Sequence, residues 1–579
     1  MNTDFLQAGI FIFVLLLLVK PFGTYIAKIF EGKPAGVNGI LLRFERMIYS
    51  FCGIKYQEGM TWKTYAISVI IFNIIGLVFL YILQRVQSVL FLNPMGMASV
   101  PPDLSFNTAV SFVTNTNWQS YSGETTMGYL TQIFGLTVQN FLSAATGMAV
   151  LLAVIRGFIN RQKETIGNFW VDITRTILYI LLPLSICLSL VLVSQGVVQT
   201  FKPYAKAHVI QPITIHHKVI KTQIIARGPV ASQTAIAQLG TNGGGFFNAN
   251  ASHPFANPNA LSNFLEMLAI LLIPASLCYT FGYMVKDKRQ GWALLAAMFI
   301  IFIPSLWAVM HFEQIGNPLL NHLNVNQKMS SLQSGGNMEG KEARFGIADS
   351  AIWTVSTTAA SNGSVNSMLD SYMPISGMVP MWLMQLGEVI FGGVGSGLYG
   401  MLAFVIVAVF MAGLMIGRTP EYLGKKIESY EIKMAALILL IPHLCVLIPT
   451  AIAVVLPSAR QAILNPGPHG FSEILYAFTS AGNNNGSAFA GLSTNTFFYN
   501  VTLGLSMFFS RFLTIIAALA IAGSLSKKKI IPTSPGTLVT YQPVFIIFLV
   551  MIILIVGALT FFPALALGPI AEHFLIAKP

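Results

Sequence analysis

The sequence predicts an all-α polytopic membrane protein with about ten transmembrane helices. Hydrophobic residues make up 54% of the 579 residues and charged residues only 9%, whereas a soluble domain averages about 25% charged residues. Apolar runs of roughly 20 residues, long enough to cross a bilayer, recur along the chain. Four short helix-like segments, each followed by a polar loop, separate these runs. They predict four span–pore-helix–span repeats around a pseudo-four-fold pore, with two extra spans.

The ten spans follow directly from the apolar runs. We expect them at 5–19, 64–84, 126–156, 172–196, 260–285, 291–311, 378–416, 432–456, 494–524 and 542–566. Asp4 precedes the first run, without a basic stretch before it or a small-residue cleavage site after it. This span is therefore expected to be retained rather than removed as a signal peptide.

Lys and Arg residues predict the topology, because they favour the cytoplasmic side of a membrane. Clusters of them follow the first span, at 20–46, and lie between alternate pairs of later spans, at 156–163, 286–289, 418–426 and 527–529. We therefore expect both termini outside. The net charge of +12 is spread between spans rather than gathered in one patch, so we expect lipid and no nucleic acid as a partner. The basic segment 200–228 alternates in polarity and is expected to form an outer hairpin.

An internal repeat connects the four polar loops TNTNW, GTNGGGFFNAN, TAASNGS and TSAGNNNGS. Asn117, Gly243, Gly363 and Gly486 align, at intervals of 126, 120 and 123 residues. A helix-start residue lies 14 positions before each of them, namely Asp103, Pro229, Asp349 and Ser472. A single Asn/Gly cluster is typical of a plain turn, but the constant spacing indicates a repeat. The predicted units are 1–62 (first span and linker), 63–160, 161–290, 291–420 and 421–530 (repeats one to four), and 531–579 (last span).

The chemistry of these loops suits a monovalent cation. Their amides, hydroxyls and bare backbone offer oxygens without charge, which can replace the water shell of such an ion. The preceding short helices would point their partially negative C-terminal ends at it. Because non-helical backbone at membrane depth needs a covering of protein or a water-filled cavity, the loops predict a cavity on the outer side.

Four further features attract attention. The segment 388–401 carries five glycines, including Gly393 and Gly395, which either pack helices closely or form an unwound gate under the filter. Arg511 lies in mid-span and either faces a cavity or forms a buried ion pair. Arg418 either serves transport or is a positive-inside anchor. Gln119 either lines the cavity or caps its loop. Segment 316–348 is expected to be an exposed loop, and the His216–His217 pair is not expected to bind metal.

Long motifs in this chain resemble the KdpA family, the potassium-binding subunit of the bacterial Kdp potassium-importing ATPase, in the superfamily of potassium transporters. TNTNWQSY, GTNGGGFFNANASHPF, TTAASNGS, GEVIFGGVGSGLYGM and TSAGNNNGSAFAGL run in order from residue 114 to 492. The resemblance implies a multi-pass protein of the bacterial cell membrane that captures extracellular potassium. It would pass the ion through an intramembrane tunnel to a KdpB-like P-type ATPase subunit, which would use ATP and Mg²⁺. KdpC-like and KdpF-like subunits would complete the complex.

The same resemblance assigns the site residues. It places potassium, the only metal ion expected, at Asn115, Thr116, Asn117, Thr241, Asn242, Gly243, Ser361, Asn362, Gly363, Asn484, Asn485 and Gly486. Gln119 would lie at a tunnel entrance below the filter, while Arg418 and Arg511 would help to block straight passage. Asn117 stands where the other three loops have glycine, so one quarter of the ring departs from a potassium-channel filter.

Two alternatives remain open on the sequence alone. A self-sufficient channel or symporter of the Trk/Ktr/HKT type would share the filter. An intramembrane enzyme would need paired catalytic groups, and Glu266 and Glu388 are expected near outer span ends without partners. The chain has neither a GxxxxGK[ST] loop nor a DKTG motif. We therefore expect no enzyme activity and no cofactor on this chain alone, with ATP hydrolysis on a partner.

Overall fold

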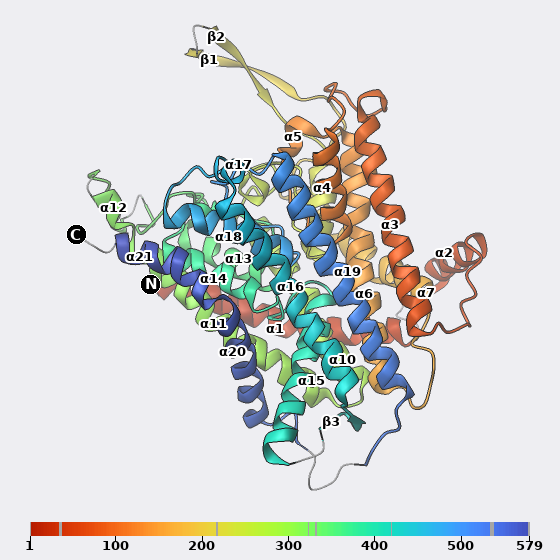
Figure 1. Ribbon diagram of the computed structural model, residues 1–579. Coiled ribbons are helices and arrows are strands. Elements are labelled where there is room, and N and C mark those ends of the chain that lie inside the picture. The colour runs from red at the N-terminus through yellow and green to blue at the C-terminus, as the bar shows by residue number, and fades with distance from the viewer. Residues whose placement is uncertain are drawn as a thin grey trace.

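The computed structural model describes residues 2–33, 38–215, 218–321, 323–330, 333–417, 420–532 and 538–576. Within these residues it is a helical bundle with ten helices that are long and apolar enough to cross a membrane (Figure 1). The predicted fold class and the number of spans are therefore confirmed.

The ten spans lie where the apolar runs predict them, apart from the seventh. They are α1 (Asn2–Phe30), α3 (Trp62–Val86), η2 (Thr131–Thr137) continuing into α6 (Val138–Ile159), α7 (Phe169–Arg175) continuing through η3 (Thr176–Leu181) into α8 (Leu182–Ser194), α10 (Ala260–Met284), α11 (Lys288–Ile315), α15 (Ser396–Ile416), α16 (Ser429–Val455), α19 (Phe497–Lys527) and α20 (Pro543–Leu565) with η6 (Ala566–Ile570).

Four short helices lie between these spans, one in each repeat. They are α4 (Pro102–Val113), α9 (Val230–Leu239), α13 (Gly346–Ala359) and α18 (Pro468–Gly482). Proline at the first helical position starts α4 and α18, where its missing N–H removes no helical hydrogen bond. Most of their residues are buried, and α19 packs against α4, α6, α16 and α18. Each short helix therefore ends inside the bundle, which brings the loop that follows it into the interior.

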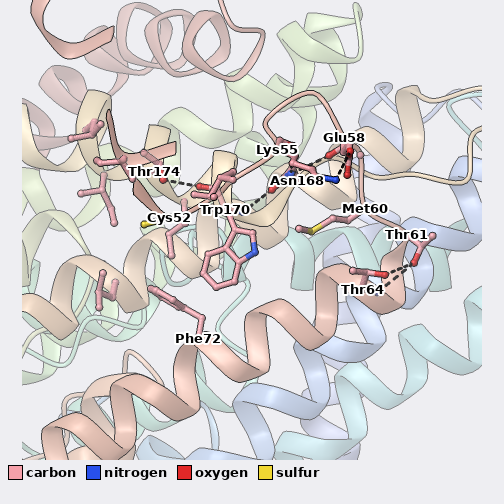
Figure 2. Close-up of a pocket in the computed structure, with 18 residues that line it drawn as sticks. Cys52, Lys55, Glu58, Met60, Thr61, Thr64, Phe72, Asn168, Trp170 and Thr174 are labelled. Atoms are coloured by element: carbon pink, nitrogen blue, oxygen red, sulfur yellow. Dashed lines mark hydrogen bonds and ion pairs between the residues drawn. The ribbon is translucent and has the colours of Figure 1, made fainter. Parts of the chain in front are cut away.

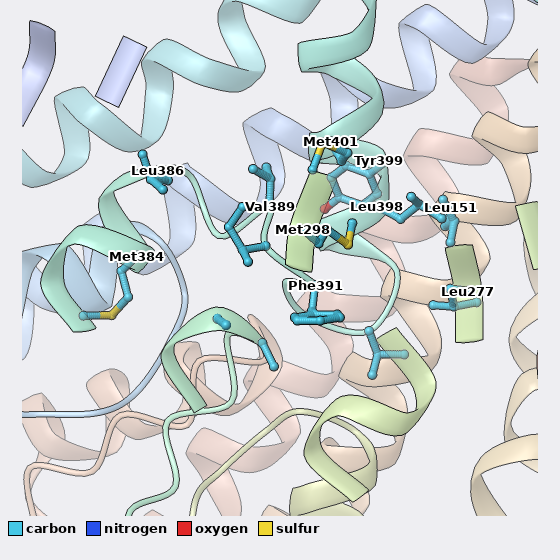
Figure 3. Close-up of a cluster of buried hydrophobic side chains, with 14 of the residues drawn as sticks. Leu151, Leu277, Met298, Met384, Leu386, Val389, Phe391, Leu398, Tyr399 and Met401 are labelled. Carbon is cyan, nitrogen blue, oxygen red and sulfur yellow. The ribbon is translucent and has the colours of Figure 1, made fainter. Parts of the chain in front are cut away.

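The expected span 378–416 is wrong, because the chain unwinds in its middle. Helix α14 (Pro374–Gln385) ends before the glycine-rich segment, and α15 begins only at Ser396. In the linker 386–395 between them, Glu388, Phe391 and three glycines have positive φ angles, which a helix cannot contain. Figure 3 shows the apolar side chains of this linker, including Val389 and Phe391, in a buried hydrophobic cluster.

The remaining elements lie at the ends of the bundle. Strands β1 (Ala205–Ile215) and β2 (Lys218–Ile225) pair antiparallel and project from one end, called here the hairpin face (Figure 1). The predicted hairpin is thus confirmed, whereas His216 and His217 lie outside the described residues. The smaller elements are α2 (Asn38–Phe51), η1 (Gln87–Val89), α5 (Gly123–Thr126), η4 (Asn250–Ser252), α12 (Pro318–Asn321), η5 (Leu369–Ser371), β3 (Glu421–Tyr422), β4 (Lys425–Lys426), α17 (Pro457–Arg460) and α21 (Ala571–Ile576).

The expectation of an exposed loop at 316–348 is only partly right. Its second half is tied to the bundle by Lys341, whose ammonium lies 2.6 Å from the Glu313 carboxylate of α11, with both side chains fully buried. Asn337 donates a hydrogen bond to the same carboxylate at 2.9 Å. Burial of a charge requires such pairing, so this half of the segment is a packed part of the fold.

Candidate functional site

The four polar loops meet in a closed ring. Asn115 of the first loop donates a side-chain hydrogen bond to the Thr241 carbonyl of the second loop at 2.8 Å. Asn362 of the third loop donates to the Ala237 carbonyl, at the end of the helix that precedes the second loop, at 3.1 Å. Residues more than 100 positions apart therefore lie side by side at the first two junctions.

The other two junctions close the ring in the same manner. Ser361 of the third loop donates to the Asn484 carbonyl of the fourth loop at 2.8 Å. Asn484 in turn donates from its amide to the Thr116 hydroxyl of the first loop at 2.9 Å. The repeats are thus arranged in cyclic order, one to four and back to one, around a common centre.

All four loops share one backbone conformation. Two residues in each have positive φ angles, in the pairs Asn115 and Asn117, Thr241 and Gly243, Ser361 and Gly363, and Asn484 and Gly486. The N–H of the residue between each pair donates to a carbonyl of the preceding short helix, at 2.8 to 2.9 Å. These hydrogen bonds satisfy the N–H groups of the loops within each repeat. The carbonyl oxygens of the loops can therefore accept hydrogen bonds from neighbouring loops or coordinate an ion.

Close approach of neighbouring loops explains three of the glycines. A Cβ atom at Gly243 would come within 2 Å of the Asn362 carbonyl oxygen. A Cβ at Gly363 would meet the Asn485 carbonyl oxygen at 2.3 Å, and one at Gly486 would meet the Thr116 carbonyl oxygen at 2.1 Å. The carbonyl of one loop therefore lies against the bare backbone of the next, which places uncharged oxygens within the ring.

Asn117, which breaks the glycine pattern, preserves the ring geometry. Its φ angle of 54° is one that Asn tolerates better than most residues. Its side-chain amide donates to Asn140 of α6 at 2.7 Å. The first loop therefore presents the same backbone as the others, with its amide committed to the neighbouring span.

A cavity of about 540 Å³ opens onto this ring, and it is lined by all four aligned residues, Asn117, Gly243, Gly363 and Gly486. Gln119 also lines it and is paired with Gly245 by two hydrogen bonds of 3.0 Å. Of the two readings that the sequence left open for Gln119, the structure shows the residue lining the cavity, where the chain leaves the ring. A part in a tunnel stays a prediction for this residue.

The unwound linker of the third repeat packs against the ring. The Val394 N–H donates to the Thr241 hydroxyl at 2.9 Å, and the Gly392 N–H donates to the Ala359 carbonyl, at the end of the third short helix, at 2.7 Å. Gly393 lies next to Ser361. At Gly395 a Cβ would meet the Gly147 carbonyl of α6 at 2.2 Å. The glycines thus allow both the turns of the linker and its close packing.

Two charged residues accompany this linker. Arg511 of α19 is 6% exposed. Its guanidinium lies near Gly147 of α6, and the Val394 carbonyl of the linker lies near the same glycine. Glu388, 4% exposed, lies beside Ser361 and Asn485 and interacts electrostatically with Arg511. Arg418, the other arginine predicted for the site, lies outside the described residues.

Glu388 is a residue that the sequence reasoning placed wrongly. It was expected near an outer span end without a partner, yet it lies in the interior beside two loops of the ring. The available signal was its position as the single acid within GEVIFGGVGSGLYGM. Glu266, the other carboxylate expected to lack a partner, accepts a hydrogen bond from Gln238 of α9 at 3.1 Å.

A second, larger cavity of about 860 Å³ lies elsewhere, between α2, α3 and α7. Figure 2 shows Phe72 and Trp170 on its wall, with Lys55 and Glu58 at the loop that borders it. Because none of the ring residues lines it, this cavity is separate from the candidate site.

The ring can coordinate a monovalent cation. Its oxygens are neutral, and four short helices end next to it, so their C-terminal dipoles favour a positive charge there. Neutral oxygens can replace the hydration shell of an alkali cation and still release the ion. Strongly hydrated divalent cations usually require carboxylate ligands, and the twelve predicted ring residues contain none.

Comparison with known proteins agrees with this chemistry. The model of the KdpA family, described as the potassium-transporting ATPase A subunit, matches residues 9–574. Proteins named potassium-transporting ATPase potassium-binding subunit are 59% identical in Sorangium cellulosum, over 99% of both chains. The corresponding figures are 61% in Herpetosiphon aurantiacus, over 100% of both chains, and 56% in a Clostridium botulinum strain, over 98% of both.

A solved structure shares the fold. The crystal structure of the potassium transporter TrkH from Vibrio parahaemolyticus superimposes with a TM-score of 0.50 at 12% sequence identity, covering 87% of this chain and 96% of that one. At this identity the likeness concerns the fold alone. Together with the match along nearly the whole sequence, the ring of four repeated loops places this chain in the KdpA family of potassium-transporting ATPase A subunits.

Proposed function

We propose that the ring is a potassium selectivity filter at the extracellular side of an ATP-driven import complex. The observation that carries this proposal is the closed ring of four similar loops, in which a carbonyl oxygen of one loop lies against the glycine of its neighbour at three of the four junctions. The twelve residues that the sequence assigned to the filter lie in this ring. The hairpin face is then the outer face, and both termini are outside.

The path beyond the filter is proposed to turn sideways. The linker 386–395 packs under the ring through Val394 and Gly392, and Arg511 adds a buried positive charge there. A fixed cation in a region of low dielectric repels a second cation. Arg511 therefore opposes straight passage, and the packed linker with Gly393 and Gly395 acts as the gate. The path that remains is an intramembrane tunnel towards a KdpB-like ATPase subunit. Arg418 is proposed to assist, and KdpC-like and KdpF-like subunits to complete the complex.

Potassium uptake by this chain would need energy from a partner subunit. A membrane potential of 100 mV supplies about 2.3 kcal/mol per charge, which corresponds to roughly a fifty-fold concentration ratio. Uptake from a more dilute medium needs a pump. The relatives are named as subunits of a potassium-transporting ATPase, so we place ATP and Mg²⁺ on the partner and potassium, as substrate, on this chain.

Substitution of Gly243 by Asp tests the filter. The new carboxylate and Cβ would fall on the Asn362 carbonyl, where only bare backbone fits. We expect the Gly243→Asp variant of the assembled complex to lose at least about ten-fold in potassium affinity, or 1.4 kcal/mol, and to discriminate less against sodium and rubidium. Gly96→Asp is the matched control, since Gly96 also has a positive φ angle but open space around it. Unchanged affinity and selectivity in Gly243→Asp would remove this residue from the filter.

Potassium-stimulated ATPase activity distinguishes the pump subunit from a self-sufficient Trk-type transporter, whose fold this chain shares. We expect the activity only when the chain co-purifies with a P-type ATPase partner, and we expect potassium uptake to stop when that partner is removed. Uptake by the chain alone in proteoliposomes would favour the Trk-type alternative.

A further inference from the structure

A cluster of carboxylates and a histidine lies outside the ring. Asp370 belongs to η5, just before α14, and His469 and Glu473 lie in the first turns of α18. One ligand atom from each of these three residues lies within 4.8 Å of the others. Glu572 of α21 approaches the histidine from the C-terminal segment. The four residues come from three distant parts of the chain, so the sequence alone does not bring Asp370 and Glu572 to the pair formed by His469 and Glu473.

One carboxylate oxygen of Glu473 accepts no hydrogen bond from the described part of the chain. Its side chain is fully buried, and Oε1 accepts a hydrogen bond from Asn465 at 2.8 Å. Oε2 has no hydrogen-bond partner among the described residues. A buried carboxylate oxygen without a partner is costly, and such an atom in a native structure points to a missing cation or water.

The histidine is oriented as metal-binding imidazoles are. His469 Nε2 lies 3.1 Å from Asp370 Oδ1, inside the cluster, while Nδ1 lies 2.8 Å from Glu572 Oε1 on the other side. In metal sites the ring nitrogen that does not bind the ion almost always donates its hydrogen to a carboxylate, a carbonyl or a water. Glu572 is placed to be that acceptor and to leave the Nε2 lone pair for an ion.

Gly491 borders the cluster, and a side chain at this position would occupy the space between the two carboxylates. A Cβ added at Gly491 would lie 2.3 Å from Glu473 Oε1 and 2.7 Å from Asp370 Oδ2. Asn465 also lies 3.3 Å from Asp370 Oδ2 and thereby holds both carboxylates. The oxygens are thus positioned by neighbours on two sides.

We propose that Asp370, Glu473 and His469 Nε2 bind a divalent transition-metal cation of the zinc class. Two carboxylates and one imidazole are ligands that zinc accepts, with water completing a four-coordinate site. Calcium and magnesium prefer oxygen ligands alone, so the imidazole favours a transition metal. The ion would join the third repeat to the fourth short helix, and Glu572 would connect it to α21. It is distinct from the potassium ring in place and in chemistry.

Metal analysis of the intact complex tests this site. The complex is stripped with a chelator, equilibrated with zinc, desalted and analysed by inductively coupled plasma mass spectrometry, with thermal unfolding measured in parallel. We expect wild type to retain zinc in a one-to-one ratio to this chain and to unfold at a higher temperature with zinc than without it. Glu473→Gln and His469→Gln should lose both effects. Glu572→Gln should weaken zinc binding about 10- to 100-fold, as removal of an outer-shell carboxylate does.

His311→Gln is the matched control, because His311 is exposed, stacks on Trp307 and is not among the residues of the cluster. It should keep the zinc of the wild type. Glu473→Gln preserves the shape of the side chain, and its unfolding temperature without zinc shows whether the variant is folded. Zinc retention that is equal in wild type and folded Glu473→Gln would overturn the proposal. X-ray absorption spectra of the zinc complex without an imidazole ligand would overturn it as well.

Discussion

At the residue scale, the same position of the ring accommodates a side chain in the first repeat and excludes one in the third. Asn117 holds its positive φ angle with a side chain bonded to Asn140. Gly363 has a φ angle of 87°, and any Cβ there would meet the fourth loop. Sequence alignment of the repeats shows that the residues differ, whereas only their surroundings show why one repeat accepts a side chain.

The two reciprocal substitutions should therefore behave differently. Asn117→Gly keeps the backbone conformation and loses one hydrogen bond, so we expect a loss of about 1 kcal/mol in stability and retention of potassium binding. Gly363→Asn must displace the Asn485 carbonyl and should lower potassium affinity by about ten-fold or more. Potassium-dependent thermal unfolding of the purified complex measures both effects. Equal behaviour of the two variants would contradict the ring geometry.

His253 predicts a pH dependence of stability near the second loop. Its ring stacks on Phe247 at 3.7 Å, and its Nδ1 accepts a hydrogen bond from the Phe255 N–H. Burial, with a smaller contribution from the positive charge of Arg344, lowers the pKa of His253 from 6.5 to about 4. The folded state therefore favours the neutral ring.

Between pH 6.5 and pH 4 the unfolded chain binds more protons at this residue than the folded chain, so the stability contribution of His253 falls as pH falls through this window. We expect a loss of about 1–3 kcal/mol for this partly exposed group. The measurement compares unfolding temperatures at pH 7.5 and pH 5 for wild type and His253→Phe, which keeps the stack but cannot titrate. A wild-type decrease no larger than that of His253→Phe would contradict the prediction.

At the element scale, the main difference from expectation is the break between α14 and α15. The sequence indicated that glycines could unwind this segment, but its apolar residues also suited a continuous span. Glu388 and Phe391 have positive φ angles, which are unfavourable for such residues. Hydrogen bonds that the linker donates to Thr241 and Ala359, and the burial of its apolar side chains (Figure 3), offset this cost. The contact with Thr241 comes from another repeat and the contact with Ala359 from a helix more than 30 positions earlier, so a local pattern could not reveal them.

Arg511 tests the proposed function of this linker. Arg511→Gln removes the buried positive charge next to Gly147 and Glu388 but retains a polar side chain. We expect the complex to assemble, with altered potassium transport and weaker coupling of ATP hydrolysis to uptake, because the barrier to straight passage is reduced. Arg161→Gln, which removes an exposed charge, is the control. Wild-type uptake and coupling in Arg511→Gln would leave this arginine with a structural role only.

At the scale of the whole molecule, a buried ion pair attaches the segment after α11 to the bundle. Lys341 and Glu313 are fully buried, and the Lys341 ammonium also lies 4.0 Å from the centre of the Tyr372 ring. Removal of one partner of a buried pair leaves an uncompensated charge. The integrity of this side of the bundle therefore depends on both partners.

Lys341→Met should lower the free energy of unfolding by about 3–5 kcal/mol. Lys55→Met should change it by less than about 1 kcal/mol, since Lys55 and Glu58 form an ion pair whose side chains are 76% and 68% exposed. Denaturant or thermal unfolding of the detergent-solubilised complex measures the difference. Similar losses in the two variants would show that Lys341 is accessible to water.

By itself the sequence determined the membrane character, the number of spans and the four repeated polar loops, because hydropathy and repeat spacing can be read along the chain without knowledge of its contacts. It did not locate Glu388 or the cluster around Glu473, and it left open whether Gln119 lines the cavity. Most of the contacts that decide these placements join residues more than 90 positions apart, such as Gln119 with Gly245, Asp370 with His469 and Glu388 with Arg511. Only the tertiary structure decided them, since burial and the cyclic order of the repeats determine which distant polar groups share an interior without water.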